Sequence, residues 1–392
     1  MNLMSKKKNF SFKEEKVRKI RLHTELCDML GIRYPIIQAG MGGIAGPCLA
    51  AAVSNAGGLG VLGATAVQPE VLRSWIRKTR ELTDKPFGVD ILMPAGTLVG
   101  GTDEELRAQI PHPQIDFIEQ LKKEYGVPEV KGKILPWTME YARSQFEVIL
   151  EEKASVFCSG LGTPDWVIPK AHAQGMKVIS LVGNVRNAVS MNKQGSDIIV
   201  AQGHEAGGHT GRIGTMALVP QVVDAVAPTP VVGAGGIGDG RGLVAALALG
   251  AVGVWVGTAF LLAKESMVEA AEGIPGMATL TEVPGAQVDR YKQRMINSNE
   301  EGTIVTRWAT GKTNRLLRHE LIDRCEKSGV PSLGMPLQSV LVTDLLAGLN
   351  KIDHPSTPLV QACGQITGML KEVKSAKQIV EEMVEQASSI LG

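Results

Sequence analysis

The 392-residue sequence lacks the features that mark several protein classes. Its five cysteines are scattered and form no C-x-x-C pair, so neither a disulfide framework nor a zinc site is indicated. The amino terminus has no apolar stretch of the kind that a secretory signal needs. These absences predict a cytoplasmic protein without a bound metal ion.

Basic residues are in excess only at the amino terminus. Residues 1–21 contain eight basic and two acidic residues, whereas the rest of the chain has a net charge of −5. The body of the protein therefore lacks the basic face that nucleic acid binding requires. We expect residues 1–21 to form a disordered basic tail.

Long hydrophobic runs are also rare, and the longest one needs an explanation. Residues 243–263 carry no charge and are numerous enough to cross a bilayer. Gly250 and Gly257 interrupt this run and divide it into a helix-like, a strand-like and a second helix-like part. We predict a buried helix, strand and helix here, and no membrane partner.

Short apolar runs alternate with helical patterns along most of the chain. Buried parallel strands have this near-continuous hydrophobic character, and eight β-α units are typical of a (β/α)₈ TIM barrel in the α/β class. The predicted strands are residues 35–39, 59–62, 87–92, 156–159, 178–182, 198–201, 231–234 and 252–256.

The alternation predicts four regions. A barrel over residues 22–263 follows the tail, with a lid-like excursion at 94–136 that contains a helix near 115–125. Residues 264–357 are predicted to form a smaller helical domain that selects the substrate, with helices at 314–328 and 339–349. Residues 358–392 return to the barrel and end in a helix at 371–391.

Two glycine-rich turns follow the last two predicted strands. Gly235, Gly236 and Gly238 come after the seventh strand, and Gly257 with Thr258 follows the eighth. Phosphate sites in barrels are often built from these two loops, whose backbone N–H groups can bind the phosphate oxygens. The turns indicate a phosphorylated ligand or cofactor, with purely structural tight turns as the alternative.

Two histidines lie on a glycine-rich segment after the sixth strand, QGHEAGGHTG at 202–211. His204 and His209 are five positions apart, so they do not match the helical spacing of a zinc protease motif. A histidine on a glycine loop at the end of a barrel strand is well placed for general acid–base catalysis. We predict that His209 is catalytic and that His204 has a structural, hydrogen-bonding role.

Several ordered motifs resemble those of the nitronate monooxygenase family, formerly called 2-nitropropane dioxygenases, which is related to the FMN-dependent enoyl-acyl-carrier-protein reductases. The resemblance runs from about Leu22 to the carboxyl terminus. It rests on the segments PIIQAGMGG, SNAGGLGVLG, TDKPFGVD, AQGHEAGGHTG, VVGAGGIGDGRG, VWVGTAF and CGQITGML.

This resemblance implies a barrel that binds FMN non-covalently, with His209 as the catalytic histidine. The phosphate would lie on the two glycine turns, on Gly235, Gly236, Gly238, Gly257 and Thr258. The flavin ring would be lined by Ala39, Gly40, Met41 and Gln202, with Gly207 close to the cofactor. Asp90 departs from the family pattern, because many members have Asn at this point of the GV-x segment.

The function that the resemblance implies is the FMN-dependent oxidation of alkyl nitronates or nitroalkanes with O₂. One alternative is an NAD(P)H-dependent FMN reductase that acts on an enone, a quinone or an enoyl thioester. A flavin-free phosphate-binding barrel, such as an isomerase or aldolase, and a non-catalytic flavin-binding role remain open. The expected partner is a small-molecule substrate, with NAD(P)H as a candidate donor and a homo-oligomer as a candidate assembly.

Overall fold

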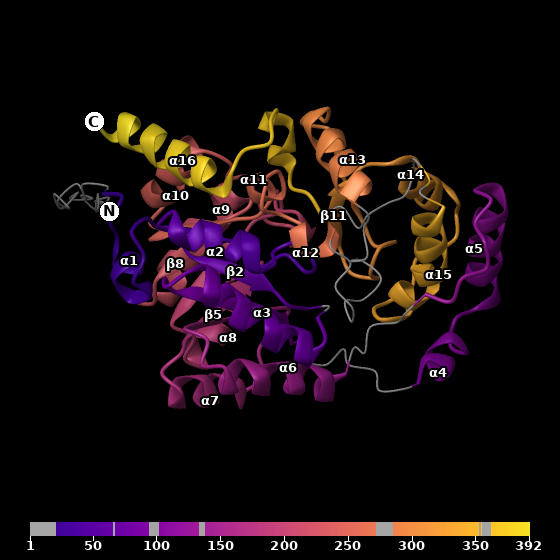
Figure 1. Ribbon diagram of the computed structural model, residues 1–392, viewed down its shortest axis with the longest axis horizontal. Coiled ribbons are helices and arrows are strands. Elements are labelled where there is room, and N and C mark those ends of the chain that lie inside the picture. Colours follow the sequence, from indigo (N-terminus) through magenta and orange to yellow (C-terminus); the bar gives the residue numbers. More distant parts are fainter. Residues whose placement is uncertain are drawn as a thin grey trace, which may run out of the picture.

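Eight parallel strands form a closed barrel in the computed structural model. Helices lie around these strands (Figure 1). The structure describes residues 21–65, 67–93, 102–132, 138–271, 285–352, 354 and 362–392. The strands follow one another around the barrel in the order β1-β9-β8-β6-β5-β4-β3-β2, and a parallel bridge between Ile37 and Leu59 joins β1 to β2. They are β1 (Ile36–Gln38), β2 (Gly60–Gly63), β3 (Phe87–Leu92), β4 (Val156–Gly160), β5 (Lys177–Val182), β6 (Ile198–Gln202), β8 (Val231–Ala234) and β9 (Gly253–Val256). The predicted TIM barrel and all eight predicted strands are confirmed.

The barrel strands are apolar on both faces, so helices cover the outer face and shield it from water. In β3, Phe87, Val89 and Ile91 pack outward against α3 and α6, whereas the core inside the barrel contains Val61 and Cys158. The surrounding helices are α1 (Glu25–Leu30), α2 (Pro47–Asn55), α3 (Pro69–Leu82), α6 (Met139–Glu151), α7 (Val167–Ala173), α8 (Val185–Lys193), α9 (Thr215–Val226), α10 (Gly240–Ala248), α11 (Thr258–Leu261) and α16 (Ala376–Leu391).

The long apolar run at 243–263 forms part of α10, then β9 and α11, as predicted. Within the part of the chain that the structure describes, no helix is both long and apolar enough to cross a membrane. The carboxyl-terminal helix α16 packs against α10 and α2, so the chain ends on the barrel. This helix begins at Ala376 and not at residue 371, because Ser375 and Gln378 form a capping box that starts it there.

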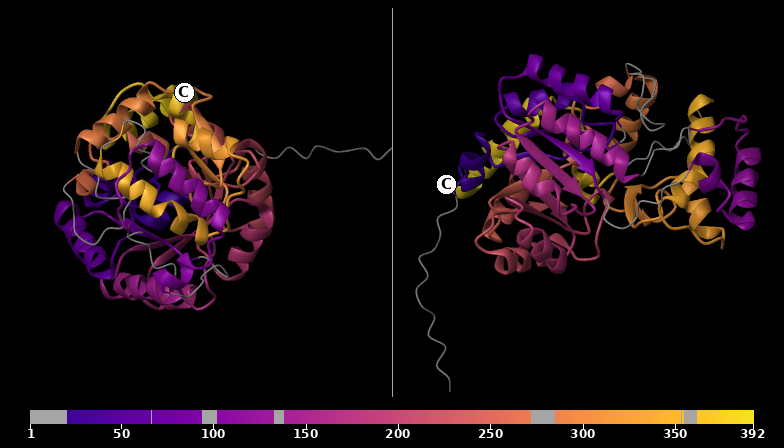
Figure 2. Two further views of the ribbon diagram at one scale, coloured as in Figure 1. Left: turned by 90° about the vertical axis from the view of Figure 1, so that its right-hand side faces the viewer. Right: turned by 90° about the horizontal axis from the view of Figure 1, so that it is seen from below.

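A second lobe lies at one end of the barrel, on the right in Figure 1 and again in the right-hand view of Figure 2. It combines two distant parts of the chain, since α4 (Asp103–Arg107) and α5 (His112–Glu124) pack against α15 (Leu337–Lys351). A bidentate ion pair joins Arg107 to Asp344, with N–O distances of 2.6 and 2.9 Å. The helices predicted near 115–125 and at 339–349 are therefore found. Residues 1–20, 94–101 and 133–137, which belong to the predicted tail and excursion, lie outside the described residues.

A small antiparallel sheet connects the lobe to the barrel. It consists of β10 (Thr303–Thr306), β11 (Asn314–Leu317) and β7 (Gly208–His209), in the order β10-β11-β7. The helix predicted at 314–328 is wrong in its first part, because residues 314–317 are buried and pair with both neighbouring strands. Helix α14 (Glu320–Lys327) starts only after His319, whose ring accepts the N–H of Ile322. The remaining described elements are α12 (Val268–Ala271), α13 (Gly285–Ile296) and the 3₁₀ helix η1 (Gln365–Met369).

Candidate active site

A cavity of about 990 Å³ lies at the carboxyl ends of the barrel strands. Its walls include residues at or after the ends of β1, β3, β4, β5, β6, β8 and β9, which is where chemistry occurs in TIM barrels. Residues 307 and 309–314 and four residues of α15 line the same cavity from the side of the lobe. The site therefore draws on both parts of the molecule.

The structure brings almost all of the predicted site residues together. His209, Ala39, Gly40, Met41, Gln202, Gly207, Gly235, Gly236, Gly257 and Thr258 all line the cavity. Gly238 does not, because it packs against η1, where a Cβ would lie 2.8 Å from Cδ1 of Ile366. His204 is also absent from the lining, and its Nδ1 lies 2.8 Å from the carbonyl oxygen of Gly211.

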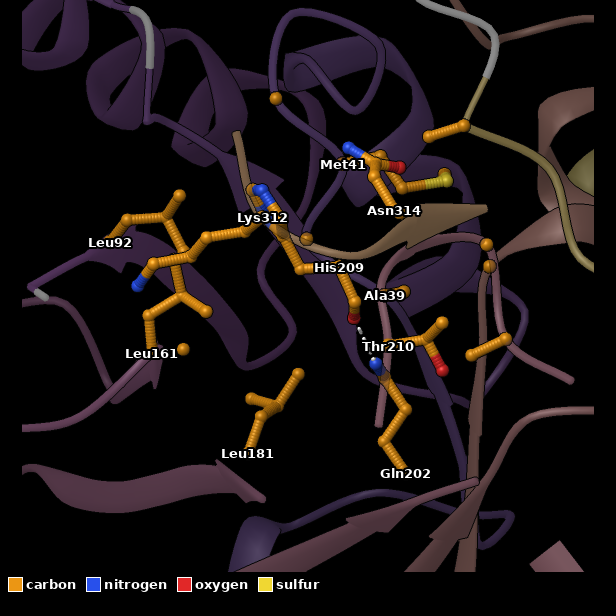
Figure 3. A pocket seen from close by; sticks show the side chains of 18 of the residues that line it. Ala39, Met41, Leu92, Leu161, Leu181, Gln202, His209, Thr210, Lys312 and Asn314 are labelled. Carbon is orange, nitrogen blue, oxygen red and sulfur yellow. Dashed lines mark hydrogen bonds between the residues drawn. The ribbon is translucent and has the colours of Figure 1, made fainter. Parts of the chain in front are cut away.

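His209 is held at the cavity by both its backbone and its ring. Strand β7 pairs with β11 so that His209 faces Asn314, and the amide of Gln202 donates a hydrogen bond of 2.7 Å to the His209 carbonyl (Figure 3). The imidazole Nε2 lies 2.8 Å from Oγ1 of Thr310. That same Oγ1 accepts the N–H of Lys312 at 3.4 Å. The position of the ring thus depends on the loop between β10 and β11.

The environment of His209 keeps its imidazole uncharged. Burial lowers the pKa of His209 from 6.5 to about 4, and the positive charge of Lys312 acts in the same direction. Burial also lowers the pKa of Lys312, which has no carboxylate within ion-pair distance among the described residues. Arg307 lines the same cavity and donates to the Gly311 carbonyl at 3.0 Å. Two cationic side chains and a neutral imidazole therefore face one space.

The cavity has the properties of a site for a large polar ligand. Oδ1 of Asp90, the hydroxyl of Tyr291 and Oδ1 of Asn314 are buried without a hydrogen-bond partner, and all three residues line it. Buried polar atoms are nearly always hydrogen-bonded in folded proteins, so these atoms indicate a missing partner. Gly235 and Gly236 have φ values of +94° and +72° and so form a tight turn after β8, and the backbone N–H groups of such turns can bind an anion. These residues fit a flavin with its phosphate on the glycine turn.

Comparison with known proteins decides the family. The family model described as nitronate monooxygenase matches residues 23–274, which is more than half of the chain. The chain belongs to the nitronate monooxygenase family. It is therefore an oxidoreductase of a flavoprotein family, as the sequence predicted.

Individual proteins are similar to this chain over nearly its full length. A protein of Staphylococcus saprophyticus named "Probable nitronate monooxygenase" is 33% identical, with 95% of this chain and 99% of that protein covered. A 5-hydroxy-7a-methyl-1-oxo-octahydro-1H-indene-4-carboxyl-CoA dehydrogenase of Rhodococcus jostii is 31% identical, with coverages of 93% and 96%. The solved nitroalkane oxidase of Streptomyces ansochromogenes superposes with a TM-score of 0.73 at 29% identity, covering 93% of this chain and 98% of that one.

Sequence reasoning missed the residues that the lobe adds to the site. Thr310, Lys312, Asn314 and Tyr291 follow the barrel in the sequence and reach the cavity only through the folding of α13 and the pairing of β11 with β7. In the sequence, the glycine at position 311 could have indicated a turn. The structure shows this turn between β10 and β11, where Gly311 has a φ of +84°. Among the described residues, no group of three or more His, Cys, Asp and Glu side chains could hold a metal ion.

Proposed function

We propose that the protein is an FMN-dependent nitronate monooxygenase that oxidises alkyl nitronates with O₂. The observation that supports this most is the uncharged imidazole of His209 in one cavity with two cationic side chains, Lys312 and Arg307. A nitronate is an anion whose carbon has already lost its proton. It therefore needs positive charge for binding more than it needs a strong base.

The cofactor in this proposal is FMN and not FAD, because the glycine turns provide for one phosphate and no second fingerprint exists for an adenosine half. The phosphate would be held by Gly235, Gly236, Gly257 and Thr258, with Gly238 shaping the turn from behind. Ala39, Gly40, Met41 and Gln202 would line the ring, and Gly207 would let it come close to the backbone. FMN, when bound, accepts electrons from the substrate and passes them to O₂.

His209 can act as a base toward a nitroalkane or as a hydrogen-bonding partner of a nitronate, and its low pKa favours the second role. A neutral ring can accept the α-proton of a nitroalkane at physiological pH, but a pKa of about 4 makes it a weak base. The same ring can hold a nitronate by a hydrogen bond without gaining a proton. The protein should therefore use nitronates better than the corresponding neutral nitroalkanes.

The lobe formed by α4, α5 and α15 is proposed to select the substrate. Ser339, Val342, Thr343 and Leu346 of α15 line the cavity opposite the barrel, so the lobe can contact the part of a small-molecule substrate that points away from the flavin. A lid-like role of the excursion at 94–136, a homo-oligomer, NAD(P)H as a donor and a cytoplasmic location stay predictions.

Anaerobic titration of the purified protein tests this function. Ethylnitronate should bleach the bound flavin, and readmission of air should restore its colour. Flavin released by heat should be FMN. Bleaching by NADH or NADPH but not by ethylnitronate would contradict the proposal and indicate the reductase. A colourless protein that does not take up FMN would indicate a flavin-free barrel.

A further inference from the structure

Asp90 is an acidic residue inside the barrel that the proposed reaction does not use. It lies on β3 between Gly63 of β2 and Cys158 of β4 in the strand register. Its side chain is only 7% exposed, and it lines the cavity. A carboxyl group in such a place needs a partner or must lose its charge.

The Asp90 carboxyl is directed at the segment assigned to the flavin ring. A Cβ on Gly40 would collide with the Asp90 side chain, so the two residues are in direct contact. Oδ1 of Asp90 is buried and has no hydrogen-bond partner. The carboxyl group that packs against Gly40 therefore has one oxygen without a partner, which points to a ligand atom that is supplied when the cofactor binds.

Among the residues that the structure describes, no cationic side chain forms an ion pair with Asp90. Gly40 and Gly63 have no side chains, and burial together with the Asp90 charge raises the pKa of the Cys158 thiol well above its ordinary value. Burial alone raises the pKa of Asp90 from 3.8 to about 8, so neither His209, Arg307 nor Lys312 offsets it. At neutral pH the carboxyl keeps its proton and can donate a hydrogen bond, as a buried neutral carboxylic acid can.

We propose that Asp90 serves the flavin site as an uncharged carboxylic acid that donates a hydrogen bond to the flavin, and that its ionisation opposes flavin reduction. This inference rests on the flavin part of the proposed function and not on the identity of the substrate. It explains how an acidic residue fits at a position where a carboxylate would repel the negative charge of a reduced flavin.

The number of protons taken up on two-electron reduction of the flavin depends on the charge of Asp90. When Asp90 is already protonated, two electrons and one proton enter the flavin. When Asp90 is ionised in the oxidised protein, the new negative charge raises its pKa, and a second proton binds to the carboxylate. Between the pKa of Asp90 in the oxidised protein and its higher pKa in the reduced protein, the reduction potential should therefore fall more steeply with pH. The additional slope corresponds to one proton per two electrons, about 30 mV for each pH unit.

The test is the midpoint potential of the FMN-loaded full-length protein over a pH range centred on about 8. In the wild-type protein, a plot of midpoint potential against pH should contain a range with the steeper slope. The Asp90→Asn variant, which keeps the shape of the side chain and a hydrogen-bond donor, should lack this range. On the alkaline side the potential of Asp90→Asn should exceed that of the wild type. Cys158→Ala is the matched control and should keep this range. Equal pH dependence in the wild type and Asp90→Asn would overturn the proposal.

A second measurement does not need a folded variant or a bound cofactor. Infrared difference spectra of the wild-type protein, taken between acidic and alkaline pH, should contain the carbonyl band of a protonated buried carboxyl that is lost near pH 8. Its loss at the ordinary pKa of a carboxyl would overturn the inference. If the band behaves as expected but no FMN binds, the proposed function has failed while Asp90 is still a neutral acid.

Discussion

At the scale of single residues, burial decides what His209 can do. Because its pKa is lowered from 6.5 to about 4, the ring is neutral above that pH and becomes charged only as the pH falls through about 4. The kcat/KM for ethylnitronate should therefore show no change due to His209 at the ordinary histidine pKa, and any change that depends on His209 should appear only near pH 4. A pH profile of the FMN-loaded protein checks this. An acidic limb centred at 6.5 that disappears in His209→Asn would contradict it.

In the proposed function, Lys312 supplies positive charge for an anionic substrate. Replacing it in Lys312→Met should lower kcat/KM for ethylnitronate by about 10- to 100-fold, because a charged hydrogen bond contributes about 1.5 to 3 kcal/mol. The loss should appear mainly in KM, and FMN content should not change. Lys351→Met, which removes an exposed lysine of the same lobe, is the control. Equal values for the two variants would exclude Lys312 from substrate binding.

The sequence predicted cavity residues that directly follow strands. It did not predict properties, such as a shifted pKa, that depend on contacts with residues distant in the sequence. His209 could be predicted as a cavity residue because a strand and a glycine-rich loop place it at the barrel mouth, whereas Gln202 was predicted from the family resemblance; both line the cavity. The sequence shows that Asp90 departs from the family pattern, but its raised pKa depends on burial, which no local pattern reveals. Gly238 shares its motif with Gly235, yet it packs against Ile366 and not against the cavity.

At the scale of elements, the short pairing of β7 with β11 positions His209. Gly208 has a φ of +75°, and a Cβ there would make only ordinary contact, 3.8 Å from Ala362. Gly208→Ala should therefore cost about 1 to 2 kcal/mol of unfolding free energy through backbone strain alone. It should also reduce turnover because the strand carries His209, whose ring is proposed to be catalytic.

Gly175→Ala is the matched control for Gly208→Ala. Gly175 has a φ of +74°, a Cβ added there would meet nothing within 4 Å, and the residue is not part of the cavity lining. Denaturant unfolding should show a similar loss of stability in both variants, whereas steady-state kinetics should show reduced turnover only in Gly208→Ala. Equal turnover in the two variants would mean that β7 does not hold His209 in its working position.

The barrel strands could be predicted because each is a continuous apolar run, which is what burial on both faces requires. Strand β11 could not, since NRLL has no strand periodicity of its own and is fixed by pairing with β10 and β7. The start of α16 was placed five residues early, because the capping residue Ser375 has more influence than the apolar spacing before it.

At the scale of the whole molecule, the lobe lies at one end of the barrel (Figure 2). The barrel carries the residues proposed to bind the cofactor, and residues of the lobe line the same cavity. The sequence predicted an additional helical part after the eighth strand. It did not indicate that α4 and α5, which follow β3, would join α15 in one core. That assembly depends on contacts such as Arg107 with Asp344, which no local pattern reveals.

The central claim, that this cavity oxidises nitronates beside a neutral His209, is tested most directly by His209→Asn with two substrates. Turnover of nitroethane, which must first lose a proton, should fall by about 10²- to 10⁴-fold. The loss with ethylnitronate should be much smaller, and FMN content should stay unchanged. Equal losses with both substrates would contradict a role as base, and unchanged turnover of both would contradict the assignment of His209 to the active site.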